Sequence, residues 1–402
     1  ELLDGNFSSA ERFGMRGLEL ANQGDDGSGR AYMVYASRLN HWFHDARDSL
    51  NYYYQAYIQS LENGDYMWAD HALSELCLYS IHLSNNLDDI LQVERDYSYL
   101  VMDPTSKRYW YFSACCTLMR DVHAALTQGV RDFDNFLPQG AERKAWIKEA
   151  QRMQAQVLIP RMTWEELGMP EHFQFSKTLV LYIFGEYRRA LECSSSINSS
   201  LHQFRGTLMV PYHAFFHALI QSRLYEGMTI TEQKRFIRQL RSTERFLKQC
   251  VDRMADNFKK LHTLVAAELA RITCDYSKAD HLYQEALSTS MDGRYLWIVG
   301  ITGECAARFY LERKEATKAV KSLHIARNAY TSWGASEKVR RLEFRYPEFF
   351  GTRPAVSTSS EHDTSETTIE DMVVGDELIT VDESQGSVTI ELESARTQND
   401  SS

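Results

Sequence analysis

A helix–turn–helix pattern that recurs after 40 residues constrains the fold of this chain more than any other feature. Ser277-Lys278-Ala279 is matched by Thr317-Lys318-Ala319, and Ala286 is matched by Ala326. Small alanine side chains at fixed places on paired helices allow the two backbones to approach closely. A helix–turn–helix period of this size is typical of stacked helical-repeat arrays.

The same style of pattern extends over most of the chain, and it predicts an all-α fold. Few prolines interrupt the apolar stripes at helical spacing, and those before residue 350 lie at expected element boundaries. We expect a superhelix of roughly eight helical hairpins. Its expected segments are N-terminal repeats (1–127), an irregular helical connection (128–172), C-terminal repeats with a capping helix (173–347) and a disordered acidic tail (348–402).

Local signals mark several helix ends. Asn63-Gly64-Asp65 predicts a C-terminal cap followed by a turn. Thr229 with Glu232, and Thr163 with Glu166, have the spacing of a capping box at a helix start. Gly185-Glu186-Tyr187 resembles the turn that begins 89 residues later, so a similar inter-helix turn is expected at both places.

The charge of the chain is concentrated in the tail. The net charge is −11, and residues 351–402 carry twelve acidic and two basic side chains, which leaves about −1 for the helical body. A body without a basic excess is not expected to bind nucleic acid or anionic membranes. The tail composition favours disorder. Its runs Leu378–Val381 and Val388–Leu392 also fit a marginal hairpin or a strand added to a partner's sheet. The four-residue apolar run Leu378–Val381, which acidic residues follow, also resembles a small-modifier-binding motif.

Phosphorylation is a further hypothesis for the tail. Ser360 and Thr367 each precede an acidic residue by three positions, which suits an acid-directed kinase. An unmodified solubilising tail is the equally weighted alternative.

The seven cysteines contain no C-x-x-C pair and fall mostly within helical patterns. Cysteine then behaves as a small apolar residue, so we expect a reducing compartment and a cytoplasmic location. No apolar run reaches the ~18 residues of a membrane span. The chain starts at Glu1 in mid-pattern, so we expect it to be part of a longer polypeptide.

No nucleotide-binding, nucleophile or metalloprotease motif is present in the sequence, so we expect no catalytic residue, cofactor or metal. His213 and His217 have helical spacing, but a third zinc ligand is not indicated, and a plain helix face is the preferred interpretation. Glu268 with Arg271, and Glu304 with Arg308, predict intrahelical ion pairs of ~0.2–0.5 kcal/mol each. A polar rung on a groove surface is the alternative.

The C-terminal repeats resemble a known family. The residues that carry the resemblance are Asn257-Phe258, Leu264, Ala267-Glu268, Ala270-Arg271, Ala279, Tyr283, Ala286 and the run Tyr330-x-x-Trp333-Gly334-Ala335-x-x-Lys338-Val339-x-x-Leu342-x-x-x-Tyr346-Pro347. This region is similar to the tetratricopeptide-like helical region of large multi-domain sensor kinases, which carry a serine/threonine-kinase-like domain, a signal-transduction ATPase, a GAF sensor and a histidine kinase. The resemblance is sharpest over about residues 250–347, and the acidic tail stands where a GAF domain would follow.

The resemblance implies a non-catalytic arm for protein interaction and signal relay, with a protein partner or a neighbouring ATPase or kinase domain. A stand-alone helical-repeat adaptor is the first alternative. A helical metal-dependent enzyme around His213 and His217 is the second. The sequence does not identify partner-binding residues.

Overall fold

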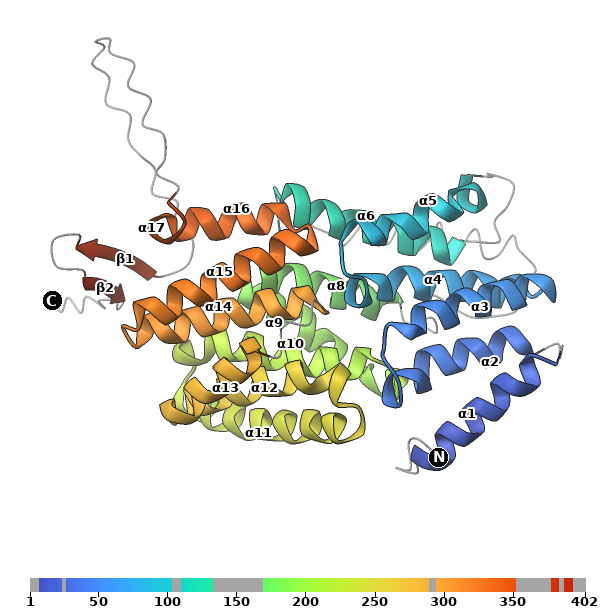
Figure 1. The fold of residues 1–402 in the computed structure, drawn as a ribbon, viewed down its shortest axis with the longest axis horizontal. Coiled ribbons are helices and arrows are strands. Elements are labelled where there is room, and N and C mark those ends of the chain that lie inside the picture. Colours follow the sequence, from blue (N-terminus) through green and yellow to red (C-terminus); the bar gives the residue numbers. More distant parts are fainter. Residues whose placement is uncertain are drawn as a thin grey trace, which may run out of the picture.

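A computed structural model describes residues 7–23, 27–102, 110–131, 133, 169–288, 294–351, 377–382 and 387–392. Its body is built from helices, which confirms the predicted all-α class (Figure 1). The helices are α1 (Phe7–Ala21), α2 (Ser28–Val34), α3 (Asp48–Glu62), α4 (Tyr66–Leu83), α5 (Asp88–Met102), α6 (Trp110–Gln128), α8 (Met169–Ile183), α9 (Tyr187–Ile197), α10 (Met209–Leu224), α11 (Ile230–Arg253), α12 (Ala255–Ile272), α13 (Tyr276–Ser288), α14 (Leu296–Glu312), α15 (Ala316–Trp333), α16 (Ser336–Arg345) and α17 (Pro347–Phe350). Short helical segments of the π or 3-10 type join some of them: η1 (Tyr35–Leu39), η2 (Asn40–Trp42), η4 (Leu201–Phe204) and η5 (Tyr225–Gly227).

Five of the helix connections in the described ranges use one turn, which we call the shared turn. One residue has a positive φ, its N–H bonds to the carbonyl three positions back, and the next N–H bonds to the carbonyl five positions back. This is a Schellman cap, and it satisfies carbonyls that the helix end would leave without partners. The positive-φ residues are Gly64, Gly185, Cys274, Lys314 and Gly334.

In four of these turns, an alanine lies five positions after the positive-φ residue and is completely buried. Its N–H donates to the carbonyl of the residue that precedes the second helix. The four residues are Ala69, Ala190, Ala279 and Ala319. Ala279 and Ala319 therefore have equivalent settings, as the 40-residue recurrence predicts, and the same unit occurs twice earlier in the chain.

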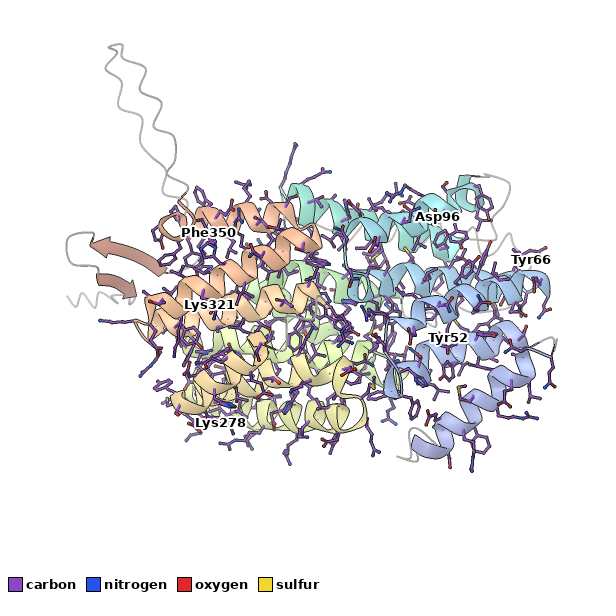
Figure 2. The ribbon with its side chains drawn as sticks, viewed as in Figure 1. Tyr52, Tyr66, Asp96, Lys278, Lys321 and Phe350 are labelled. Carbon is purple, nitrogen blue, oxygen red and sulfur yellow. The ribbon has the colours of Figure 1, made fainter. Side chains whose placement is uncertain are left out.

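Lys314 adopts a positive φ of 59° that L-residues other than glycine rarely use. Its side chain is exposed, so little contact is lost on its removal. We expect Lys314→Gly to raise the free energy of unfolding by roughly 0.5–1 kcal/mol, because glycine has no Cβ to strain the turn. Lys321→Gly, at an exposed position within α15 (Figure 2), should instead lower it by about 1 kcal/mol. Urea denaturation measures both; equal losses in the two variants would contradict a strained turn.

Glycine allows α14 and α15 to pack closely. A Cβ added at Gly303 would lie 2.7 Å from the Ser322 carbonyl oxygen and 2.8 Å from Ala326 Cβ. We expect Gly303→Ala to lower the free energy of unfolding by about 1–3 kcal/mol, because a backbone carbonyl cannot give way without separating the helices. The matched control is Gly17→Ala in α1, where a Cβ meets nothing within 4 Å; it should be neutral or stabilising by up to ~1 kcal/mol. Thermal unfolding of the two variants makes the comparison.

The two predicted repeat segments contact each other in several places. Asn257 of α12 bonds to the backbone of residues 41–46, and the Trp42 indole N–H donates to the Gly206 carbonyl at 2.9 Å. The Leu87 N–H donates to the Trp333 carbonyl at 2.8 Å, and α16 lies beside α6 (Figure 1). These contacts connect the start of the chain to its last helices, so the described helices form one body.

The capping box at Thr229 and Glu232 is confirmed at the start of α11. The one predicted at Thr163 and Glu166 lies outside the described residues, as do most residues of the predicted connection 128–172. In the tail, β1 (Glu377–Asp382) and β2 (Ser387–Leu392) pair antiparallel, with Ile379 opposite Ile390. The hairpin alternative is present over these two runs, which are rich in β-branched residues. Residues 352–376, 383–386 and 393–402 lie outside the described part.

Candidate functional site

His213 and His217 on α10 are bonded to a serine in the structure. Ser194 Oγ of α9 lies 3.2 Å from His213 Nε2 and 2.8 Å from His217 Nδ1. Burial lowers the pKa of His213, and it lowers the pKa of His217 to about 4, so both rings stay neutral at pH 7. Among the described residues, no group of three or more His, Cys, Asp or Glu side chains is placed to hold a metal ion.

A serine next to two histidines also resembles part of a hydrolase constellation. A nucleophile must be reachable by substrate, and Ser194 is completely buried. His213 Nε2 additionally lies 2.8 Å from the Ser194 carbonyl oxygen. The three residues therefore tie α9 to α10 by hydrogen bonds, and this geometry favours a structural role.

The predicted intrahelical pair of Glu268 and Arg271 is present, but it is buried and belongs to a larger cluster. The Glu268 carboxylate accepts from Arg271 Nη2 at 2.9 Å, from Arg308 Nη2 at 3.2 Å and from the Tyr283 hydroxyl at 2.6 Å. Burial alone would raise the pKa of Glu268; the two guanidiniums and the hydroxyl overcome it and lower the pKa to about 2. The Glu268 carboxylate is thus the ion-pair partner of two arginines, Arg271 and Arg308.

The predicted pair of Glu304 and Arg308 is wrong. Glu304 accepts from Lys338 Nζ of α16 at 2.8 Å and from the Tyr330 hydroxyl of α15 at 2.7 Å. Arg308 turns to Glu268 on the neighbouring hairpin. Helical spacing made the two residues neighbours on α14, but stronger partners were available on the helices packed against it. Glu304 and Arg308 therefore join α14 to neighbouring helices. This arrangement is closer to the alternative that we considered for the two pairs, a polar rung across the repeats.

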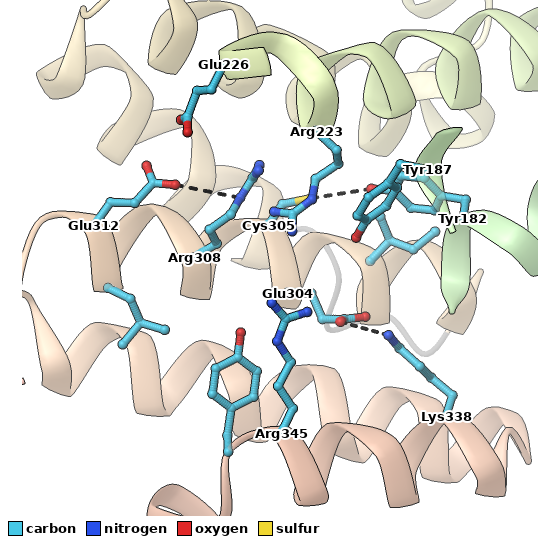
Figure 3. Close-up of a pocket in the computed structure, with 13 residues that line it drawn as sticks. Tyr182, Tyr187, Arg223, Glu226, Glu304, Cys305, Arg308, Glu312, Lys338 and Arg345 are labelled. Carbon is cyan, nitrogen blue, oxygen red and sulfur yellow. Dashed lines mark hydrogen bonds and ion pairs between the residues drawn. The ribbon is translucent and has the colours of Figure 1, made fainter. Parts of the chain in front are cut away.

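A cavity of about 210 Å³ lies where α8, α9, α10, α14 and α16 meet (Figure 3). Arg223 enters it from α10, Tyr187 from the start of α9, and Arg308 and Glu312 from α14. Four cationic and three acidic side chains line it, with three tyrosines and Cys305. The Tyr182 hydroxyl and Cys305 Sγ are 3.7 Å apart on its wall.

The Arg223 guanidinium lies over the ring of Tyr187, with 4.9 Å from Cζ to the ring centroid. Its Nε is buried and has no hydrogen-bond partner. Arg308 Nε is also buried without a hydrogen bond, and a Glu312 carboxylate oxygen lies 3.9 Å from it. Burial raises the pKa of Glu312. Two buried guanidinium nitrogens of this cavity thus have no hydrogen-bond partner.

A second depression is apolar and open. The groove between α1 and α2, which we call the α1–α2 groove, has a volume of about 500 Å³. Its walls include Phe13, Val34 and Leu39, and small residues Gly14 and Gly17 form part of its floor. Phe13 is 61% exposed and Val34 is 48% exposed, so two apolar side chains of one groove face solvent together.

Buried histidines give the body a pH dependence. His82 lies among the rings of Phe175, Tyr212 and Trp297, and burial lowers the pKa of His82 to about 3. The folded state keeps this ring neutral while the unfolded chain binds a proton below about pH 6.5, so stability falls as the pH drops through that window. For one histidine the loss at pH 5 is about 2 kcal/mol.

We therefore expect His82→Phe to lose about 2 kcal/mol less stability than wild type between pH 7.5 and pH 5. Urea unfolding at the two pH values measures it. His281→Phe, an exposed change on α13, is the matched control and should keep the wild-type difference. An unchanged pH dependence in His82→Phe would contradict a buried neutral ring.

Asp70 has the opposite effect on the pH dependence of stability. Its carboxyl group accepts from the N–H groups of Tyr111 and Phe112 in the first turn of α6. Burial raises the pKa of Asp70 to about 8 against the effect of these two bonds. Its contribution to stability is complete below about pH 4 and is lost as the pH rises through 8. The total change of stability with pH therefore contains opposing contributions from His82 and Asp70. The difference in this change between wild type and a His82 variant isolates the contribution of His82.

The sequence did not single out Arg223, Tyr187 or Arg345 as site residues, because they come from separate helices and carry no motif. One signal was available for Tyr187, which follows the shared turn at Gly185 directly and so begins the second helix of its hairpin. Within the described ranges, no helix is long and apolar enough to cross a bilayer. No protein-family model and no curated protein sequence matches this chain.

Proposed function

We propose that this chain is a non-catalytic protein-interaction and signal-relay module of the tetratricopeptide-like type, which docks an amphipathic helix of a partner protein or of a neighbouring ATPase or kinase domain. The α1–α2 groove carries this proposal. Its apolar walls, small floor residues and exposed Phe13 and Val34 match the way in which a helix lays its apolar face between two others.

The packing of the body supports a relay role. The groove lies on α1 and α2, α2 contacts α3 and α4, and residues 41–46 are bonded to Asn257 of α12. A partner that shifts α2 therefore acts on elements connected to the C-terminal helices. Such coupling requires that the partner bind two arrangements of these helices with different affinity.

The test is affinity capture from extracts of the source organism with identification by mass spectrometry. We expect the 402-residue chain to retain a protein or polypeptide that contains an ATPase or kinase domain, and Phe13→Asp/Val34→Asp to lose it. Tyr99→Asp, at a position of α5 that is 62% exposed, is the matched control and should retain it. Equal capture by the groove variant, or capture of no such protein, would refute the proposal.

A stand-alone adaptor would have the same groove. It would differ from a relay module in that its reading frame would not encode an ATPase domain upstream. A reading frame that continues upstream into an ATPase domain decides for the relay module. A metal-dependent enzyme is the less supported alternative, because Ser194 already occupies one ring nitrogen of each of the two histidines.

A further inference from the structure

The cavity shown in Figure 3 contains one cation, Arg223, whose position neither the groove nor the inter-helix ion pairs of the body explain. A guanidinium has five N–H donors, and a ring face satisfies none of them with a strong hydrogen bond. The Arg223 guanidinium has the ring of Tyr187 and, within the described part of the chain, no hydrogen bond or ion pair. Arg223 is half-buried and its Nε has no partner, so an anion in the cavity would give this guanidinium the charge-assisted bonds that it lacks.

Two of the carboxylates nearby are committed to other cations. Glu304 is held by Lys338, and Glu268 behind the wall is shared by Arg271 and Arg308. Glu226 belongs to η5 and is exposed to solvent. The lining side chains have an excess of one positive charge, so the cavity as a whole attracts an anion.

From this geometry we propose that the cavity binds a small carboxylate anion, with Arg223 as the main contact and Arg308 as the second cation. A guanidinium presents two parallel N–H donors that fit the two oxygens of a carboxylate. The contact with the ring of Tyr187 restricts the Arg223 side chain before an anion binds, which reduces the entropy lost on binding. This site goes beyond the proposed docking function and does not rest on it.

Size and charge select the class of ligand. The volume of about 210 Å³ equals roughly seven water molecules at ~30 Å³ each, which suits an acid of a few carbon atoms. A single excess positive charge matches a monoanion. A phosphate dianion would exceed it and would face the Glu312 carboxylate, which is 3.9 Å from Arg308 Nε on the same wall.

The experiment is calorimetric titration of the full 402-residue chain with sodium butyrate, L-glutamate, inorganic phosphate and sodium chloride at equal ionic strength. We expect saturable binding of at least one of the two carboxylates, with phosphate and chloride weaker. Arg223→Gln should weaken the carboxylate at least about tenfold, a change of about 1.4 kcal/mol. Arg223→Lys keeps the charge but lacks the paired N–H donors of the guanidinium. Its affinity for the carboxylate should lie between those of wild type and Arg223→Gln.

Arg238→Gln, an exposed change on α11, is the control for general electrostatic effects and should bind as wild type does. Since Arg223 donates no hydrogen bond to a described residue, we expect its variants to fold, and circular dichroism checks this. A tetrapeptide with one central glutamate tests a protein side chain as the source; we expect it to bind more weakly than the free acids. Stronger binding of the peptide or of phosphate, no binding of either carboxylate, or unchanged binding by Arg223→Gln would overturn the proposal.

Discussion

Glu268→Gln should lower the free energy of unfolding at pH 7 by about 3–5 kcal/mol, among the largest effects of any single change in this chain. Glutamine keeps the shape of the side chain but removes the charge that Arg271 and Arg308 share. Both guanidiniums stay buried, with the Glu312 oxygen at 3.9 Å from Arg308 as the nearest remaining carboxylate. Urea denaturation followed by far-ultraviolet circular dichroism measures the loss.

The pH dependence provides an internal check on this variant. The pKa of Glu268 is about 2 in the folded state against 4.5 for an unperturbed glutamate, so its contribution is present above pH 4.5 and is lost as the pH falls towards 2. The gap between wild type and variant should therefore narrow below pH 4.5. Glu304→Gln is the matched control, because Glu304 neutralises one lysine at a half-buried site; we expect a loss of about 1–2 kcal/mol. A similar loss in both variants would contradict the shared role of Glu268.

Asn257→Ala should cost about 3–5 kcal/mol, because every hydrogen-bonding position of this buried amide is used. Asn257 Nδ2 donates to the carbonyls of His41 and His44 at 2.8 and 2.7 Å. Its Oδ1 accepts from the Ala46 N–H at 3.0 Å and from the Tyr295 hydroxyl at 3.2 Å. Alanine leaves three backbone groups of residues 41–46 without partners. Chemical denaturation measures the change in stability.

Asn257→Asp tests whether the shape of the side chain or its hydrogen-bond donors stabilise the fold. Aspartate has the same shape, but it places an oxygen against the His41 and His44 carbonyls, so we expect a loss at least as large as that of alanine. Asn63→Ala, an exposed asparagine with one bond to Ser28 Oγ, should cost less than about 1 kcal/mol. If Asn257→Asp were as stable as wild type, the segment 41–46 would not depend on the amide.

Local features of this fold were predictable from the sequence because they depend on neighbours within a few residues. The apolar stripes predict the helices, and Thr229 with Glu232 predicts the start of α11. The spacing of Ala279 and Ala319 predicts equivalent hairpins, and Ala69 and Ala190 follow the same rule once the positive-φ residue is known. Two of those positive-φ residues are Cys274 and Lys314, so a glycine does not mark every copy of the turn.

Long-range contacts were not predictable in this way. Glu304 and Arg308 have the spacing of an ion pair, yet their partners are Lys338 and Glu268 on other helices. Nothing in the sequence near Arg223 indicates that it meets Tyr187 and Arg308 across five helices. The candidate sites depend on how the hairpins pack, and a one-chain pattern contains no information on which helices become neighbours.

The docking function depends on the α1–α2 groove, and photo-crosslinking tests it most directly. A photoreactive phenylalanine analogue at position 13 places the probe inside the groove, and the same analogue at Tyr99 places it on an exposed site of α5. The account predicts a single crosslinked species from position 13 that maps to a helix of an ATPase- or kinase-containing protein, and none from position 99. The same products from both positions, or no product from position 13, would contradict it.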